Sequence, residues 1–229
     1  MLTKARCLSN ITGKEAAAKD AYKAAIEAAG KNINLAVEAT TELADALATG
    51  GDVDGAKKAL DECAEKYKDP GLKQYLDGMK EDFDIIGTDP TPIHVKGLDG
   101  KPLSLESMKG KVVLIDFWAT WCGPCMAELP NVLATYKKYH DKGFEIVGIS
   151  LDRAEDEQKL KDTMAAKGMT WPQYYDGKFW KNEVAVAYGI QSIPATYLLD
   201  RNGKIIRKGL RGPALGKAVA KALSAPAKL

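Results

Sequence analysis

The stretch VVLIDFWATWCGPC, residues 112–125, decides the fold of this 229-residue chain. Its first seven residues form a nearly continuous apolar run, which is typical of a central β-strand covered on both faces. The stretch ends in two cysteines, Cys122 and Cys125, and a helical pattern continues from Gly123 to about Lys142. The sequence therefore predicts a buried strand that passes directly into a helix, with both cysteines at the junction.

Strands and helices alternate on both sides of this junction. The turn dipeptides Asp99-Gly100 and Asn202-Gly203 each separate two short apolar segments, and each therefore predicts a β-hairpin. The predicted strands are 93–96, 103–105, 112–118, 144–150, 196–199 and 205–208, and the predicted helices are 123–142, 154–167 and 213–223. This order of elements favours an α/β sandwich around a mixed sheet.

Residues 1–85 differ in composition from the rest of the chain. They carry 12 basic and 16 acidic residues against 21 and 15 in the remainder, and all four tryptophans lie after residue 117. Apolar residues recur at helical spacing within 18–29, 36–50 and 56–67, with a shorter pattern at 72–79. Pro70-Gly71 is expected to end the third helix. We therefore predict a small all-α domain, 1–85, followed by an α/β domain, 86–229.

The helical domain carries two further cysteines. Cys63 lies on an apolar stripe and is expected to be buried, whereas Cys7 is expected in a mobile terminus. A disulfide between them stays open, because sequence spacing cannot test it. The alanine-rich helix faces bury little area per residue, so this domain is expected to pack against another surface, to self-associate or to dock a protein partner.

Overall composition excludes several classes of protein. Apolar residues make up 45% and charged residues 28% of the chain, as in an ordinary soluble globular protein. No apolar run approaches the roughly 20 residues of a membrane-spanning helix. The net charge of +2 gives no sign of nucleic-acid binding. The first residues contain no apolar core of a signal peptide, so the protein is either cytoplasmic or has a leader outside this numbering.

The strand–helix junction suits a reactive thiol. The N-terminus of a helix carries partial positive charge and unpaired N–H groups, which stabilise a thiolate and lower the pKa of Cys122. Cys125 follows one turn later, so the two sulfurs can form a small-ring disulfide, with Cys122 exposed and Cys125 beneath it. Pro124 is tolerated in the first turn because its missing N–H would have no partner inside the helix.

The segment DFWATWCGPC, residues 116–125, resembles the active-site segment of the thioredoxin superfamily. The segment SIPAT, residues 192–196, is similar to the superfamily loop whose proline is cis and faces the disulfide. Residues 125–130, 147–152 and 187–190 resemble the TlpA/ResA-type subgroup of thiol–disulfide oxidoreductases. The resemblance covers about residues 86–229 and implies a thioredoxin-like three-layer α/β/α sandwich with a mixed sheet.

The residues and the resemblance together indicate a set of site residues. Asp116 lies on the apolar strand, where desolvation should raise its pKa, so it is a candidate base for the Cys125 thiol. Glu128 matches an acid of the subgroup, although an ordinary exposed helix glutamate is the alternative. The candidate catalytic residues are Cys122, Cys125, Asp116 and Glu128, and the candidate substrate-binding residues are Trp121, Gly123, Pro124, Ile193 and Pro194.

The function expected from this site is thiol–disulfide exchange, with the protein as a reductant of protein disulfides. The expected partners are protein disulfide substrates and an upstream thiol reductant, and no cofactor or metal is expected beyond the Cys122–Cys125 pair. The resemblance implies an extracytoplasmic location in the bacterial periplasm or cell envelope. Two alternatives stay open: a disulfide isomerase that dimerises through the helical domain, and a partner-binding adaptor with the same fold.

Overall fold

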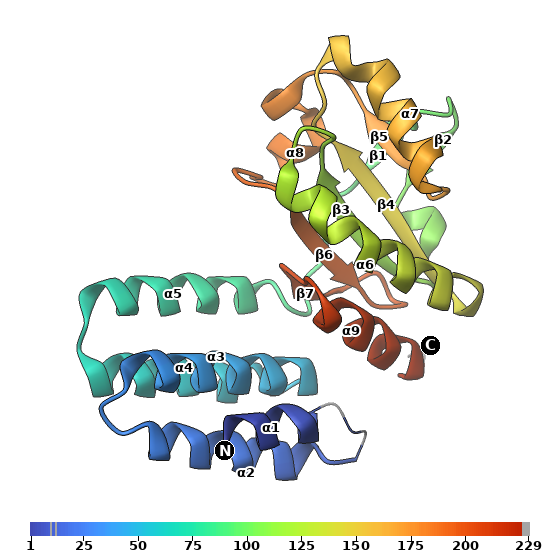
Figure 1. Cartoon of the computed structure of the whole chain (residues 1–229). Helices are drawn as coiled ribbons and strands as arrows, with labels where there is room; N and C mark the ends of the chain where they lie inside the picture. Colours follow the sequence, from blue (N-terminus) through green and yellow to red (C-terminus); the bar gives the residue numbers. More distant parts are fainter. Residues whose placement is uncertain (10, 12, 226–229) are drawn as a thin grey trace. The chain divides into compact units, whose positions relative to one another are not determined.

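The computed structural model describes residues 1–9, 11 and 13–225. The chain divides into two compact units, Met1–Ile86 and Gly87–Leu229, which Figure 1 shows in blue to green and in green to red. The boundary follows Ile86, next to the position at which composition and hydrophobic pattern change. Each unit has its own core, and each is described by itself.

The described part of the first unit is built from α-helices. They are α1 (Leu2–Ser9), α2 (Glu15–Ala29), α3 (Ile33–Gly50), α4 (Val53–Tyr67) and α5 (Pro70–Asp84). The side chains of Asn32, Asp52 and Asp69 accept backbone N–H groups at the starts of α3, α4 and α5, as N-cap residues do. The core of this unit combines many alanines with a few large side chains such as Leu60 and Phe83.

Two expectations for this unit need correction. Cys7 lies on α1, a helix that was not predicted, and not in a mobile terminus. Pro70 begins α5 and does not end α4, because the first turn of a helix needs no N–H from its proline and Asp69 caps the new helix. Cys63 is buried, as predicted. Cys7 is exposed, and both cysteines are free thiols, so they form no disulfide with each other.

The second unit is organised around a five-stranded sheet in the order β5-β4-β3-β6-β7. Its strands are β3 (Val112–Trp118), β4 (Phe144–Ser150), β5 (Gln173–Tyr175), β6 (Ala195–Leu199) and β7 (Ile205–Lys208), and β1 (His94–Lys96) and β2 (Pro102–Ser104) form a separate hairpin. β3 pairs in parallel with β4, with Val112 opposite Phe144, and antiparallel with β6. The sheet is therefore mixed, as predicted, and every residue of β3 is buried.

Helices cover both faces of this sheet. Helix α6 (Gly123–Tyr139) follows β3 directly and packs beside α9 (Pro213–Ser224) (Figure 1). Successive residues of a strand point to opposite faces. Asp116 points toward α6, where it shares a pocket with Cys125, whereas the ring of Phe117 lies 5.3 Å from that of Tyr188 at the end of α8 (Glu183–Ala187). This arrangement is the predicted three-layer sandwich.

The connection between β4 and β6 holds a strand and helices of the α/β unit that were not predicted. The expected helix 154–167 is a 3₁₀ turn, Ala154–Asp156, followed by α7 (Glu157–Lys167). β5, a second 3₁₀ turn at Phe179–Lys181, and α8 come next and have no counterpart in the prediction. Within the residues that the structure describes, no helix has both the length and the apolar character needed to cross a bilayer.

Candidate active site

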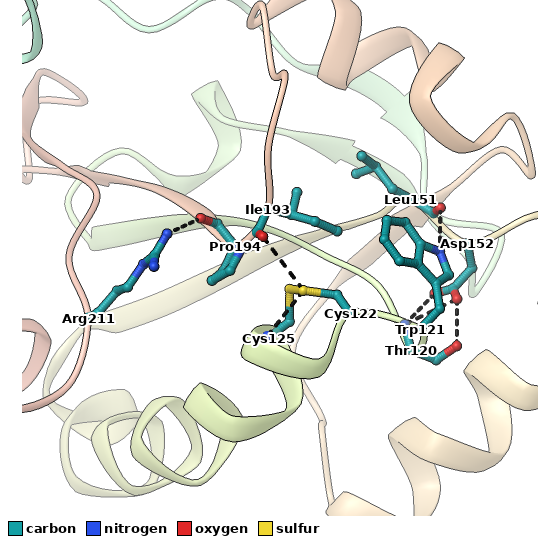
Figure 2. The surroundings of a disulfide bond; sticks show 9 residues. All are labelled: Thr120, Trp121, Cys122, Cys125, Leu151, Asp152, Ile193, Pro194 and Arg211. Carbon is teal, nitrogen blue, oxygen red and sulfur yellow. Dashed lines mark hydrogen bonds between the residues drawn. A yellow bond between two sulfur atoms is a disulfide. The ribbon is translucent and has the colours of Figure 1, made fainter. Parts of the chain in front are cut away.

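The two cysteines of the CGPC segment form a disulfide at the start of α6 (Figure 2). Cys122 is the N-cap residue of this helix, and its Sγ accepts the backbone N–H of Cys125 at 3.1 Å. This N–H is one of the groups that have no partner inside the helix. The same N–H group and the helix dipole would stabilise negative charge on Cys122 Sγ when the disulfide is reduced.

The expected exposure of Cys122 is wrong for this disulfide form. Cys122 is 4% exposed and Cys125 is 6% exposed, so both are buried. The reason is the loop before β6: the carbonyl oxygen of Ile193 lies 3.7 Å from Cys122 Sγ and covers it. The neighbouring residues Trp121, Gly123 and Pro124 are exposed and form the accessible rim of the disulfide.

The loop that covers the disulfide contains the expected cis-proline. The peptide bond between Ile193 and Pro194 is cis, and Figure 2 shows both residues beside the disulfide. The guanidinium of Arg211 donates a hydrogen bond to the carbonyl oxygen of Pro194 at 2.9 Å. The Thr196 hydroxyl donates to the carbonyl of Leu210 at 3.2 Å. Residues 210–211 therefore hold this loop against the disulfide from behind.

Asp116 lies beneath the disulfide in a desolvated position. It is buried in the middle of the sheet and lines one small pocket together with Cys125, Glu128 and Pro194. Burial, together with a smaller effect of the nearby negative charge of Glu128, raises the pKa of the Asp116 carboxyl to about 7. A carboxyl with such a pKa can both accept and release a proton near neutral pH.

Glu128 is tied into the structure and is not a free surface glutamate. It is half-buried on α6, and its Oε1 accepts the backbone N–H of Gly212 at 2.7 Å and the side-chain amide of Asn131 at 2.6 Å. Asn131 also donates to the carbonyl of Gly212 at 2.8 Å. The segment 210–212 thus contacts both the cis-proline loop and the acidic residue near the disulfide.

Asp152 is a residue near the site that the sequence reasoning missed. It is fully buried and accepts the backbone N–H and the hydroxyl of Thr120, the latter at 2.6 Å, and the hydroxyl of Ser150 at 2.8 Å. The Trp121 indole N–H donates to the carbonyl of Leu151 at 3.2 Å (Figure 2). The end of β4 therefore fixes the two residues before Cys122. The parallel pairing of β3 and β4 was the available signal, because it brings their carboxyl ends to one edge.

The described residues offer no metal site. Among residues 1–9, 11 and 13–225, no three His, Cys, Asp or Glu side chains gather in a way that could hold an ion. What the site does provide is a disulfide that can open and close, a helix N-terminus that stabilises a thiolate and a carboxyl with a pKa near neutrality. This combination suits two-electron thiol–disulfide exchange.

Comparisons with known proteins agree with this chemistry. Residues 87–223 match the family model described as Redoxin. The chain is 35% identical over 129 residues to the thiol-disulfide oxidoreductase ResA of Bacillus cereus, covering 56% of this chain and 72% of that protein. The corresponding protein of Oceanobacillus iheyensis is 38% identical over 137 residues, covering 57% and 68%.

A solved structure extends the comparison to the fold. The thioredoxin domain of a thiol-disulfide oxidoreductase from Bacteroides vulgatus is 37% identical, with a TM-score of 0.55, and the match covers 61% of this chain and 98% of that domain. Family, relatives and fold point to the same chemistry as the geometry around Cys122. The chain belongs to the Redoxin family and is a thiol–disulfide oxidoreductase of the TlpA/ResA type within the thioredoxin superfamily.

Proposed function

We propose that this oxidoreductase reduces disulfide bonds of protein substrates, with Cys122 as the attacking thiolate. The observation that carries the proposal is the position of Cys122 at the N-cap of α6, bonded to Cys125 one turn later. In the reduced enzyme, the Cys122 thiolate attacks one sulfur of the substrate disulfide. A mixed disulfide forms, and the other substrate sulfur leaves as a thiolate.

Cys125 completes the exchange. Its thiolate attacks Cys122 Sγ, the mixed disulfide breaks, and the second substrate sulfur leaves as a thiolate. The substrate has then gained two electrons, and the enzyme holds the Cys122–Cys125 disulfide. Cys125 begins this step as a buried thiol and needs a base. Asp116 is the candidate base, because its pKa of about 7 lets it accept the proton near neutral pH. Burial and, to a smaller extent, the charge of Glu128 keep that pKa high.

The substrate chain is proposed to lie over the exposed rim of the disulfide. Ile193 and Pro194 flank Cys122 on one side and would pair with the substrate backbone, as the superfamily resemblance implies. Trp121, Gly123 and Pro124 are exposed and would contact its side chains. An upstream thiol reductant would restore the dithiol, and the disulfide would carry both electrons without a bound cofactor.

Location and the role of the helical unit are further parts of the proposal. An extracytoplasmic site of action agrees with the TlpA/ResA resemblance. Docking of a partner or self-association through residues 1–85 stays a prediction, which light scattering of the full chain tests by its molar mass. The isomerase and adaptor alternatives are less well supported, because the matching relatives carry the name of thiol–disulfide oxidoreductases.

Trapping of the mixed disulfide tests the proposal. A Cys125→Ser variant should form a covalent adduct with an oxidised protein substrate, seen as a mass increase that dithiothreitol removes. Cys122→Ser should form none, and its rate of disulfide reduction should fall by more than about 1,000-fold, because the attacking sulfur is gone. A Cys7→Ser, Cys63→Ser variant is the matched control and should keep the wild-type rate. Absence of any adduct with Cys125→Ser would contradict the two-cysteine scheme.

The reduction potential tests the direction of electron flow. Equilibration of the Cys122–Cys125 pair with thiol buffers should give a value near or below about −270 mV, which marks a donor of electrons to substrate disulfides. A value near −120 mV would mark an oxidant and overturn the proposed direction. The fluorescence of Trp121 and Trp118 provides the signal, because both lie next to the site.

A further inference from the structure

Three aromatic side chains form a cluster on the rim of the disulfide. The ring of Trp121 lies 5.1 Å from that of Phe179 and 5.9 Å from that of Trp180, and the latter two rings are 5.8 Å apart. Trp121 is 38% exposed, and Phe179 and Trp180 are half-buried. We call these three residues the aromatic ledge. It joins the residue before Cys122 to the 3₁₀ turn that follows β5.

Both halves of the ledge are held in place by hydrogen bonds. The indole N–H of Trp121 donates to the carbonyl of Leu151. On the other half, the Asp176 carboxylate accepts the backbone N–H groups of Lys178 and Glu183, each at 3.0 Å, and the side-chain amide of Asn182 at 3.1 Å. These bonds fix both ends of the turn that carries Phe179 and Trp180. A preorganised surface loses less side-chain freedom when a partner binds.

The backbone at Phe179 adopts a conformation that is unfavourable for a residue with a bulky side chain. Its φ is +56°, in the left-handed region, which is a genuine outlier for a bulky residue. Gly177, two residues earlier, has a similar φ of +70°. A glycine would adopt this conformation without strain at residue 179 as well, so folding alone does not call for phenylalanine. Strained positions of this kind cluster at binding and catalytic sites.

The Phe179 ring is also held from the side of Arg153. The guanidinium carbon of Arg153 lies 4.4 Å from the ring centroid, in cation–π contact. The ring therefore contacts Arg153 as well as Trp121, and both contacts hold it beside the rim of the disulfide. An apolar surface kept in this way beside a redox disulfide is available to a substrate.

We infer that the aromatic ledge binds an apolar side chain, preferentially an aromatic one, that flanks the cysteine of the substrate disulfide. This inference rests on the proposed function. Figure 2 shows Trp121 and Pro194 on opposite sides of the Cys122–Cys125 disulfide. A substrate cysteine bonded to Cys122 would thus have the cis-proline loop on one side and the ledge on the other. An extended chain advances roughly 3.3 Å per residue, so the side chains one or two residues from the cysteine are the candidates to contact the ledge.

Model peptides test the inference on the full-length protein. Each peptide carries one cysteine as a mixed disulfide with glutathione, and a phenylalanine or an alanine at one of the two positions on either side. At one of these positions wild-type protein should give a kcat/KM about tenfold higher for phenylalanine than for alanine, which corresponds to roughly 1.4 kcal/mol. The ratio between the two peptides is the measured quantity, because a general loss of activity cancels from it.

Variants of the ledge assign the selectivity to its rings. Phe179→Gly keeps the backbone conformation that φ requires and removes the ring, and Trp180→Ala removes the second ring. Each should bring the phenylalanine-to-alanine ratio close to one. Phe179→Leu keeps an apolar side chain and should retain part of the ratio. Tyr75→Ala removes an exposed aromatic side chain from the helical unit and should leave the ratio unchanged.

The outcomes separate this inference from the proposed function. A ratio of one at every position in the wild type, or an unchanged ratio in both Phe179→Gly and Trp180→Ala, overturns the inference. Hydroxyethyl disulfide serves as a small probe with no flanking side chain. If the reduced wild-type protein reduces neither this probe nor the peptides, the proposed function itself is wrong.

Discussion

The helical unit and the α/β unit bury different kinds of side chain. Among the described residues, Thr40 is the single buried polar residue of the helical unit. The described part of the α/β unit buries nine: Asp116, Thr135, Glu145, Ser150, Asp152, Gln173, Asn182, Thr196 and Arg207. Buried polar groups are expensive unless they find partners, so a fold that keeps many of them uses them for a purpose.

Several of these buried polar groups surround the disulfide. Asp152 and Ser150 hold the residues before Cys122, Thr196 anchors the cis-proline loop, and Asn182 supports the aromatic ledge. Asp116 differs from these residues in its role, because burial raises the pKa of its carboxyl and makes it a candidate base. The comparison teaches that the first unit is held together by apolar packing, whereas the second sacrifices some stability to arrange its redox site.

The largest expected effect concerns Asp116. A carboxyl whose pKa rises on folding destabilises the folded state as the pH rises from its ordinary pKa near 4 to the folded value of about 7. Asp116→Asn should therefore raise the free energy of unfolding of the oxidised protein by on the order of 4 kcal/mol above pH 7, and by nothing below pH 4. Urea unfolding at a series of pH values measures the difference.

A carboxyl of the helical unit provides the matched control for that experiment. Hydrogen bonds from Lys73 and Lys80 lower the pKa of the half-buried Asp77 carboxyl. Its contribution to stability is therefore present above pH 4 and is lost as the pH falls through the lowered pKa. Asp77→Asn should slightly destabilise the protein at neutral pH, the opposite sign to Asp116→Asn. Equal signs for the two variants would refute the contrast between the units.

A smaller effect is expected from the core of the helical unit. Leu60 is fully buried on α4, and Leu60→Ala should lower the free energy of unfolding of this unit by about 3 kcal/mol, because a cavity replaces the side chain. Circular dichroism during thermal unfolding measures the loss of helix. The rate of hydroxyethyl disulfide reduction by the folded protein should stay at the wild-type value. A parallel fall in that rate would mean that the apolar unit takes part in the chemistry.

The smallest effect is expected at Arg211. Arg211→Ala removes one hydrogen bond to the Pro194 carbonyl, worth about 1 kcal/mol, and should lower kcat/KM for a protein disulfide by roughly fivefold. Arg6→Ala is the counterpart in the helical unit, where the guanidinium bonds Glu38 and Glu42. That variant should leave kcat/KM unchanged. An equal fall in kcat/KM in both variants would show that Arg211 has no specific role in positioning the cis-proline loop.

The central elements of the α/β unit could be predicted from the sequence because their apolar runs are long. The bounds of β3 and β4 agree with the predicted 112–118 and 144–150. β5 and α8 were missed, because three and five residues are too few for a periodic pattern to emerge. α1 was missed because only two of its eight residues are buried, which is too few to give a helical hydrophobic pattern.

The residues of the candidate site that lie close together in the sequence could be predicted, and those joined only by the fold could not. Cys122, Cys125 and Asp116 lie within one short segment, so their relation follows from the strand–helix junction. The hydrogen bonds from Gly212 to Glu128 and from Thr120 to Asp152 join residues 84 and 32 positions apart. No local pattern marks such contacts. The burial of Cys122 was missed because it depends on the distant loop at Ile193.

The short span of the Cys122–Cys125 disulfide bears on how stable the protein stays during catalysis. The two residues are three positions apart, so the bond closes a very small loop and restricts the unfolded chain little compared with a disulfide between distant segments. Both units should stay folded when it opens, because each core also contains many buried apolar side chains that the bond does not link. The protein can therefore be oxidised and reduced over many turnovers while both units stay folded.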